Sequence, residues 1–263
     1  MHAQIVLFDG FDPLDAIAPF EVLSAGGVAA HGQLTVELVS AEGPREVVSG
    51  TGGLALRTTA ALDPARPGLI LLPGASGRIG ALDTEVAPQP DADAEPQLGS
   101  DADADADADV DPQLGSGPDP DGSHHALGPK EAESIPVLLG RTLTTDLPAL
   151  LKAAMENPEI TVTTVCGGSA LLAMAGLIEG RHATTHHLGL DLLDATGTHA
   201  VDARIVDDGD LVTGAGVTSG LDLALYLLER ELGPRIAHAV EALFAYERRG
   251  TVWRNTGPEP AAF

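Results

Sequence analysis

The sequence is poor in several kinds of residue, and each shortage excludes something. It has one cysteine in 263 residues, so no internal disulfide can form, and only 3% aromatic residues, so we expect a core of Ala, Val, Leu and Ile. No run of 18 uncharged apolar residues is present, which predicts that no segment spans a membrane. The N-terminal MHAQIVLFDGFDPLD lacks a basic leader and predicts a first strand rather than a signal peptide. These features together favour a cytoplasmic protein.

Positive charge is also scarce. There are 14 Lys and Arg against 39 Asp and Glu, which gives a formal net charge of −25. Residues 84–135 carry −13 of this charge, so the rest of the chain carries −12. Such a surface repels nucleic acids and anionic membranes, and neither is a predicted partner. We favour adaptation to salt as the origin of the acidity, with compositional drift in a GC-rich genome as the alternative.

Residues 84–135 differ in composition from the rest of the chain. Asp alternates with Ala, PQLGS occurs at 96–100 and again at 112–116, and almost nothing is available to bury. We therefore predict a disordered, extended insertion. Its Asp-x-Asp pattern is similar to part of an EF-hand loop but lacks the required Gly and terminal Glu, so any cation binding is expected to be weak.

Outside this insertion, short β-rich apolar runs alternate with helix-forming segments. The expected strands are 3–8, 34–40, 68–74, 160–165 and two within 199–214 around a DDGD turn. The expected helices are 15–26, 146–158 (with an Asp cap), 168–179, 218–232 and 235–248. Such alternation predicts a mostly parallel sheet with helices on both faces. We therefore expect one α/β domain over residues 1–263, interrupted at about 84–135.

The single cysteine stands where the strand 160–165 gives way to the helix 168–179. Residues at such a junction face the crevice above the carboxyl edge of a parallel sheet. Gly167 and Gly168 provide the small neighbours that a sharply turned nucleophile elbow needs. The helix N-terminus would lower the pKa of the Cys166 thiol. We predict a reactive thiol; the alternative is a buried cysteine that acts as a small hydrophobe.

Four segments, in order, resemble a known family. They are FDPLDAIAPFEVL (11–23), LILLPGASG (69–77), TTVCGGSALLAMAGLIEGRHATTHH (163–187) and ARIVDDGDLVTGAGVTSGLDLALYLLERELG (203–233). They are similar to the DJ-1/PfpI (ThiJ/PfpI) superfamily, which has the class I glutamine amidotransferase-like fold, and especially to its isocyanide (isonitrile) hydratase branch and to the sensor domains of AraC-type regulators. The resemblance covers the chain except roughly 84–140. It implies a flavodoxin-like three-layer sandwich and a homodimer.

The resemblance also assigns site residues. Cys166 matches the nucleophile, and Asp15 matches an acidic residue that handles the thiol proton, although Asp is also a common N-cap and could merely cap helix 15–26. Backbone N–H groups of Ala75 and Gly167 match the donors that stabilise developing negative charge. His186 matches a position near the nucleophile, where it acts as a base or is simply satisfied by a backbone carbonyl.

Other positions are expected to line the pocket or depart from the family pattern. Gly74, Gly216 and Thr218 are the predicted lining, with Thr218 or Ser219 capping the helix 218–232. Ala75 replaces the usual glycine. Gly167 stands where hydratases of this branch commonly have threonine and protease-like members have histidine, which argues against a Cys–His peptidase.

No cofactor and no metal ion are predicted. The glycines of GAGVTSG (214–220) do not have the spacing of a nucleotide-binding loop, and no ribose-binding acid follows them. His186 and His187, taken with His124, His125 and His199, do not have the spacing of metal ligands.

The resulting prediction is a cysteine-dependent enzyme acting on a small electrophilic substrate, best described as hydration of an isocyanide to an N-formamide. One alternative is glyoxalase or deglycase activity on reactive carbonyls. Another is a non-enzymatic ligand sensor, redox sensor or chaperone-like protein related to the AraC-type sensor domains. The lack of a helix-turn-helix segment after the domain disfavours the regulator.

Overall fold

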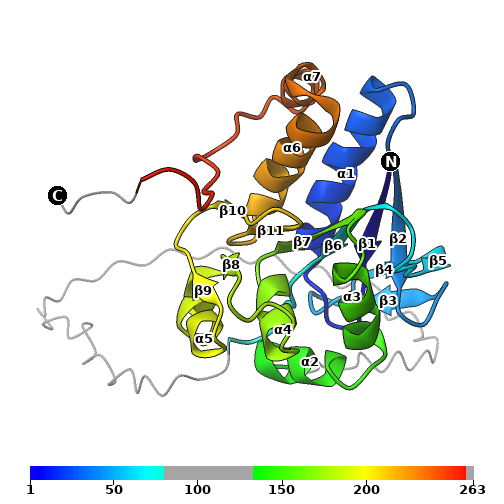
Figure 1. Cartoon of the computed structure of the whole chain (residues 1–263). Helices are drawn as coiled ribbons and strands as arrows, with labels where there is room; N and C mark the ends of the chain where they lie inside the picture. Colours follow the sequence, from blue (N-terminus) through cyan, green and yellow to red (C-terminus); the bar gives the residue numbers. More distant parts are fainter. Residues whose placement is uncertain (80–132, 259–263) are drawn as a thin grey trace, which may run out of the picture. The chain divides into compact units, whose positions relative to one another are not determined.

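A seven-stranded, mostly parallel sheet forms the centre of the molecule (Figure 1). The computed structural model describes residues 1–79 and 133–258. The strand order is β10-β11-β7-β6-β1-β2-β5, and every neighbouring pair is parallel except β10 with β11. The strands are β1 (His2–Val6), β2 (Thr35–Ser40), β5 (Ala60–Ala61), β6 (Gly68–Leu72), β7 (Ile160–Val165), β10 (Ile205–Asp207) and β11 (Leu211–Gly214). The predicted flavodoxin-like α/β fold class is confirmed.

Helices cover both faces of this sheet. On one face lie α1 (Pro13–Ala29), α6 (Ser219–Leu232) and α7 (Pro234–Phe244), and on the other lie α2 (Ile135–Thr142), α3 (Leu147–Met155) and α4 (Gly168–Met174) (Figure 1). The smaller elements are β3 (Glu46–Val48), β4 (Ala55–Arg57), β8 (His182–Ala183), η1 (His187–Gly189), α5 (Leu190–Ala195) and β9 (His199–Ala200). None of the helices within the described ranges is long and apolar enough to cross a bilayer.

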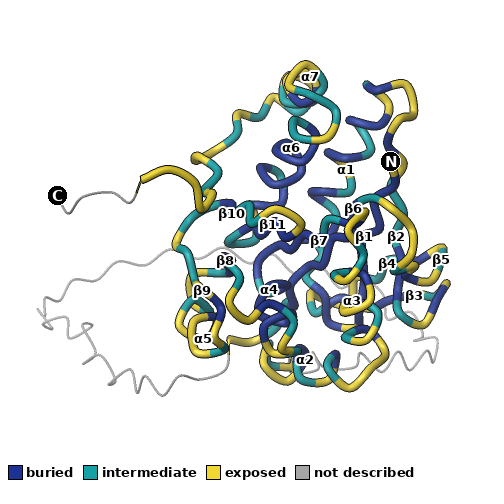
Figure 2. Tube along the Cα trace, in the orientation of Figure 1, coloured by how far each residue is buried: buried dark blue, intermediate teal, exposed yellow. Residues whose placement is uncertain are grey.

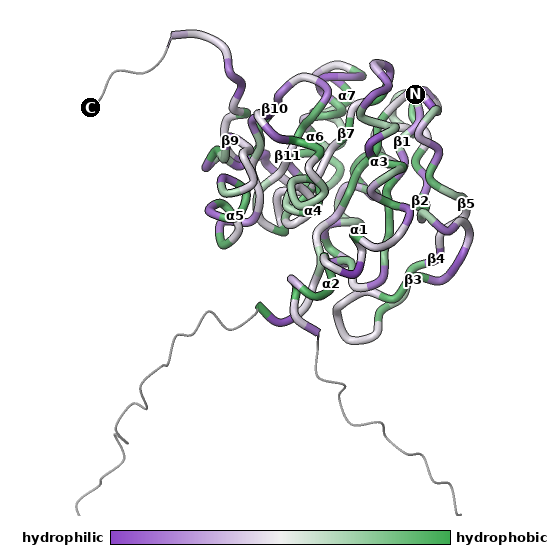
Figure 3. Tube along the Cα trace, turned by 60° about the horizontal axis from the view of Figure 1, so that its bottom comes forward, coloured by the Kyte–Doolittle hydropathy of each residue, from purple (hydrophilic) through white to green (hydrophobic). Residues whose placement is uncertain are grey.

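The core lies between the sheet and its two helical layers. β1 is buried along its whole length, and β6 and β7 nearly so, as expected for central parallel strands that are covered on both faces (Figure 2). Hydrophobic and hydrophilic colours alternate along the trace, and several outer turns are strongly hydrophilic (Figure 3). Aliphatic side chains and Phe11 account for the largest fully buried groups, in agreement with the scarcity of aromatic residues.

Several element boundaries differ from the sequence predictions. α1 continues through the glycine pair at which it was expected to stop, because a Cβ on Gly27 would lie 2.2 Å from the Leu34 carbonyl oxygen, and close packing requires glycine there. α4 ends at Met174, just before Gly176 adopts a φ of +70°. α7 ends at Phe244, where Ala245 is left-handed.

Two further local predictions are corrected. Asp146 occupies the N-cap position of α3, but its side chain makes no capping hydrogen bond. The segment 199–214 forms three strands: β9 pairs with β8, and only β10 and β11 form the hairpin around the DDGD turn.

The acidic insertion predicted at about 84–135 lies, except for its last three residues, outside the described residues, and the single-domain organisation stays a prediction. The chain on its two sides is nevertheless held together. Arg78 and Ser134 form a parallel β-bridge, in which the Arg78 N–H donates to the Glu133 carbonyl and the Ile135 N–H donates to the Arg78 carbonyl, both at 2.9 Å. The described chain therefore leaves and re-enters the fold at neighbouring positions.

Candidate active site

The predicted nucleophile elbow is formed by Cys166, directly after β7. Its φ of +53° lies in the left-handed region, which is unfavourable for a residue with a side chain. The Cys166 N–H donates to the carbonyls of Gly214 (3.1 Å) and Ala215 (2.8 Å), and the Cys166 carbonyl accepts from Thr185 Oγ1 (2.9 Å). These contacts from both sides maintain the strained turn.

The two glycines after the cysteine have different reasons to be there. A Cβ on Gly168 would lie 2.3 Å from the Leu72 carbonyl oxygen, so only glycine allows α4 to start this close to the end of β6. Gly167 has an ordinary φ of −71°, and a Cβ there would lie 3.6 Å from Gly74 Cα and 3.9 Å from Ala75 N. Position 167 therefore has room for a side chain.

Asp15 projects from the first turn of α1 and is completely buried. It is not the cap of this helix: Asp12 is the N-cap, and its Oδ1 accepts from the Leu14 N–H at 2.9 Å. Asp15 Oδ2 accepts from the Gly74 N–H at 2.9 Å, and the carboxyl interacts with the Cys166 thiol. Oδ1 forms no conventional hydrogen bond with any described residue. The reading of Asp15 as a mere cap is therefore wrong.

The thiol and the carboxyl both bind their protons more tightly than usual, mainly because both are buried. Burial, and then the negative charge of Asp12, raises the pKa of Asp15 to about 8. Burial, and then the negative charge of Asp15, raises the pKa of the Cys166 thiol, while the Gly167 N–H acts in the opposite direction. The prediction of an acidified thiol has the wrong sign, because a seven-residue helix does not outweigh the desolvation of a side chain that is 8% exposed. Both shifts favour the protonated forms of the two groups.

Two backbone donors lie beside this pair. Ala75 faces Phe11 in an antiparallel bridge of the kind in which the N–H groups of the paired residues point away from each other. Its N–H is close to Gly167 and has no acceptor among the described residues. The Gly167 N–H lies close enough to the Cys166 thiol to favour its ionised form. The two predicted donors therefore lie next to the thiol.

His186 lies nearby but is not in contact with the thiol. Its Nδ1 accepts from the Leu188 N–H at 3.3 Å, and its ring packs against that of His187, with 4.2 Å between the centroids. A Cβ on Gly216 would lie 3.7 Å from His186 Cδ2, so these two predicted pocket positions adjoin each other. Burial and the neighbouring His187 lower the pKa of His186. Its role as a base stays a prediction.

The remaining predicted lining residues divide between the site and its surroundings. Gly74 belongs to the site, since a Cβ there would lie 2.6 Å from Gly167 N and 2.9 Å from Asp15 Oδ2. Thr218 turns away and accepts from Arg204 Nη2 at 3.1 Å. Neither Thr218 nor Ser219 caps α6: Thr218 makes no capping bond, and the buried Ser219 hydroxyl has no partner among the described residues.

The sequence reasoning missed the hydroxyls that support the elbow. Ser169 Oγ donates to the Thr184 carbonyl at 2.6 Å, and Thr185 donates to the Cys166 carbonyl. The segment ATTHH contained this signal, but its histidines are the more obvious candidates. Within the described part of the chain, no three His, Cys, Asp or Glu side chains are grouped as a metal site would require.

Part of this site lies in a stretch that matches a known protein family. Residues 141–230, which include Cys166 and α6 up to Arg230, match the model of the DJ-1/PfpI family. This stretch of the chain is similar to that family. Solved structures have the same fold over nearly the whole chain. A ThiJ/PfpI family protein from Pseudomonas syringae gives a TM-score of 0.62 at 20% identity, covering 94% of this chain and 76% of that one. Drosophila melanogaster DJ-1beta gives a TM-score of 0.62 at 15% identity, covering 94% of this chain and 98% of that one.

Curated relatives match shorter stretches of this chain. The isonitrile hydratase of Pseudomonas putida is 45% identical over 85 residues, which is 32% of this chain and 37% of that protein. The transcriptional regulator CdhR of Pseudomonas aeruginosa is 32% identical over 105 residues, 38% of this chain and 31% of that protein. The match therefore spans only about a third of each of these relatives.

Proposed function

We propose that this chain is a cysteine-dependent hydratase that adds water to an isocyanide or a similarly small electrophile. One observation carries the proposal: the strained Cys166 lies against a buried carboxyl, Asp15, whose pKa of about 8 keeps it protonated at neutral pH. The similarity to a protein named isonitrile hydratase supports the isocyanide as the electrophile. We further propose that the protein acts as a homodimer in the cytoplasm, where the thiol stays reduced.

The first half-reaction joins the thiol to the substrate. The terminal carbon of an isocyanide must gain a proton and a nucleophile. Asp15 gives its proton to this carbon, the Cys166 sulfur bonds to the same carbon, and the thiol proton passes to the Asp15 carboxylate. The product is a covalent thioimidate on Cys166, and Asp15 is protonated again. Burial of Asp15 is thus useful, because an ionised carboxyl could not supply the proton.

The second half-reaction uses water. Water adds to the thioimidate carbon, and one of its protons passes to the nitrogen. The carbon–sulfur bond then breaks, and the sulfur regains the other proton through Asp15. The net change is one isocyanide plus one water to one N-formamide. The Gly167 N–H, which favours the ionised form of the thiol, stabilises negative charge on the sulfur as it leaves.

Reactive carbonyls are the second candidate class, and one observation favours them. The Ala75 N–H has no acceptor among the described residues and lies close to Gly167. Attack of Cys166 on an aldehyde would create an alkoxide that could accept from this donor. A non-enzymatic ligand sensor is the third candidate, supported by the similarity to CdhR, a protein named as a transcriptional regulator.

Turnover assays separate these candidates. The full chain is assayed with p-nitrophenyl isocyanide and with methylglyoxal, beside Cys166→Ala and Asp15→Asn chains. The hydratase proposal expects formamide production that the cysteine variant abolishes and the aspartate variant strongly reduces. Turnover of methylglyoxal alone would favour the carbonyl class. Saturable isocyanide binding without turnover would favour a sensor.

Position 167 offers a more specific test. Hydratases of the isocyanide branch commonly have threonine at this position. If its hydroxyl assists hydration, Gly167→Thr should raise isocyanide turnover above that of the natural chain. The geometry permits this side chain, since its Cβ would make only ordinary contacts. Gly167→Val is the matched control, because valine has the shape of threonine without its hydroxyl. Equal rates in the two variants would remove the threonine argument.

A further inference from the structure

A second polar network reaches the elbow from α6. Asp222 on this helix is completely buried, and its Oδ2 accepts from Arg204 Nε at 2.6 Å. The same carboxylate accepts from the Tyr246 hydroxyl at 3.0 Å and from the Arg249 N–H at 2.7 Å. A buried charge with this many partners holds the arginine in one orientation. The pair is separated by 18 residues in sequence and does not touch the thiol.

Arg204 contacts the loop before α6 at two points. Its Nη2 donates to Thr218 Oγ1 at 3.1 Å, and its own carbonyl accepts from the Ala215 N–H at 3.0 Å. The Ala215 carbonyl in turn accepts from the Cys166 N–H at 2.8 Å. A continuous series of hydrogen bonds therefore runs from Asp222 through Arg204 and Ala215 to the strained cysteine.

We infer that Asp222 and Arg204 are a positioning pair: they fix the loop 214–218, whose carbonyl holds Cys166 in its left-handed conformation against Asp15. The inference rests on the proposed role of Cys166 as the nucleophile. Loss of the pair releases the loop, the cysteine relaxes to an ordinary backbone conformation, and the thiol moves away from the carboxyl. We therefore expect Asp15 to have less effect on the titration of the thiol when the pair is removed, in addition to any loss of stability.

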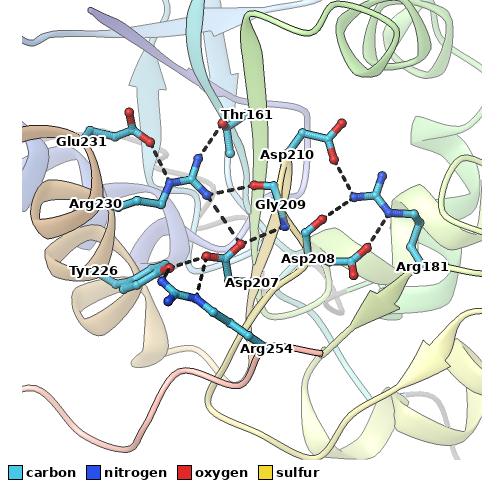
Figure 4. A network of polar contacts seen from close by, with 10 residues as sticks. All are labelled: Thr161, Arg181, Asp207, Asp208, Gly209, Asp210, Tyr226, Arg230, Glu231 and Arg254. Atoms are coloured by element: carbon cyan, nitrogen blue, oxygen red, sulfur yellow. Dashed lines mark hydrogen bonds and ion pairs between the residues drawn. The ribbon is translucent and has the colours of Figure 1, made fainter. Parts of the chain in front are cut away.

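The opposite end of the same hairpin provides a matched control. There, Arg181 binds Asp208 (2.5 Å) and Asp210 (2.6 Å) within the turn that joins β10 to β11 (Figure 4). Leu211 pairs with Val162 near the start of β7, whereas Gly214 pairs with Val165 at its end, so this network lies away from the elbow. Its removal should cost an ion pair of the same kind without disturbing Cys166.

The test is a double-mutant cycle read by alkylation. The rate of Cys166 modification by iodoacetamide is measured against pH in the full chain, with and without Asp15→Asn, in three backgrounds: natural, Asp222→Asn and Arg181→Gln. The charged groups that act on the thiol from α1 are Asp15 and Asp12, and Asp12 is kept throughout. Circular dichroism verifies that each chain is folded.

Removing a neighbouring like charge should lower the midpoint of the natural chain by about one pH unit. We expect the same shift in the Arg181→Gln background and less than half of it in the Asp222→Asn background. If Asp222→Asn does not fold, Arg204→Lys and Tyr246→Phe weaken the pair without leaving a bare buried charge, and should give intermediate shifts. An equal shift in every background overturns the positioning role alone. No shift in the natural chain overturns it together with the proposed Cys166–Asp15 pair.

Discussion

At Asp15, stability and reactivity oppose each other. The carboxyl is entirely buried beside the thiol, and its pKa is raised from 3.8 to about 8. A group whose pKa is higher in the folded state binds its proton more tightly there than in the unfolded chain. Its favourable contribution is fully present below about pH 4 and is lost as the pH rises through about 8. The chain retains a destabilising residue where the proposed reaction needs a proton.

Asp15→Asn should therefore stabilise the protein, and more so at higher pH. Asparagine has nearly the same shape, stays neutral and can still accept from the Gly74 N–H. We expect little change in melting temperature at pH 4 and a gain at pH 8 on the order of a few kcal/mol in unfolding free energy. Thermal melts across this range provide the measurement. The exposed carboxylate variant Glu42→Gln is the control, and a gain that does not grow with pH would contradict the raised pKa.

At the scale of elements, the junction of β7 and α4 was the most predictable part. The strand 160–165 and the cysteine after it follow from a β-branched run that changes to small residues, and the structure has the same strand and the elbow. The start of α1 was less accessible, because Asp12 and Asp15 are both plausible caps from their residue type, and only the hydrogen bond from the Leu14 N–H to Asp12 identifies the cap. The pKa of the thiol could not be predicted, since its dominant causes are burial and a residue 151 positions earlier.

Long-range pairs were inaccessible to sequence patterns for the same reason. Arg204 directly precedes β10, and Asp222 lies on α6. The sequence pattern of each element is complete by itself and gives no sign that the two residues pair. The two-residue strands β8 and β9 are too short to show any alternation, so only tertiary packing defines them.

The start of α4 gives a prediction that separates two adjacent glycines. Gly168→Ala should destabilise the protein by roughly 1–3 kcal/mol, because its Cβ would lie 2.3 Å from the Leu72 carbonyl oxygen and the backbone must shift. Gly167→Ala should change stability by less than about 1 kcal/mol, since its Cβ makes only ordinary contacts. Urea unfolding of both variants measures the difference. Equal losses would show that α4 starts differently from the structure described.

For the whole molecule, the β-bridge between Arg78 and Ser134 allows the acidic segment to be removed cleanly. Replacement of residues 80–132 by a linker of about four Gly and Ser residues should leave the fold and Cys166 reactivity unchanged. If the segment buries nothing, as its composition predicts, the shorter connection should stabilise the chain by up to about 2 kcal/mol through loop-closure entropy. Circular dichroism and thermal melts measure this. A clear fall in melting temperature would contradict the prediction from composition.

The central claim is that Cys166 reacts covalently and Asp15 supplies the proton. The most direct measurement is the intact mass of the protein, quenched during turnover of p-nitrophenyl isocyanide. We predict a mass increase equal to one substrate molecule, located on the peptide that contains Cys166, strongly reduced in Asp15→Asn and absent from Cys166→Ser. Formamide production by the Cys166→Ser chain at the natural rate, with no adduct on the natural protein, would contradict the account.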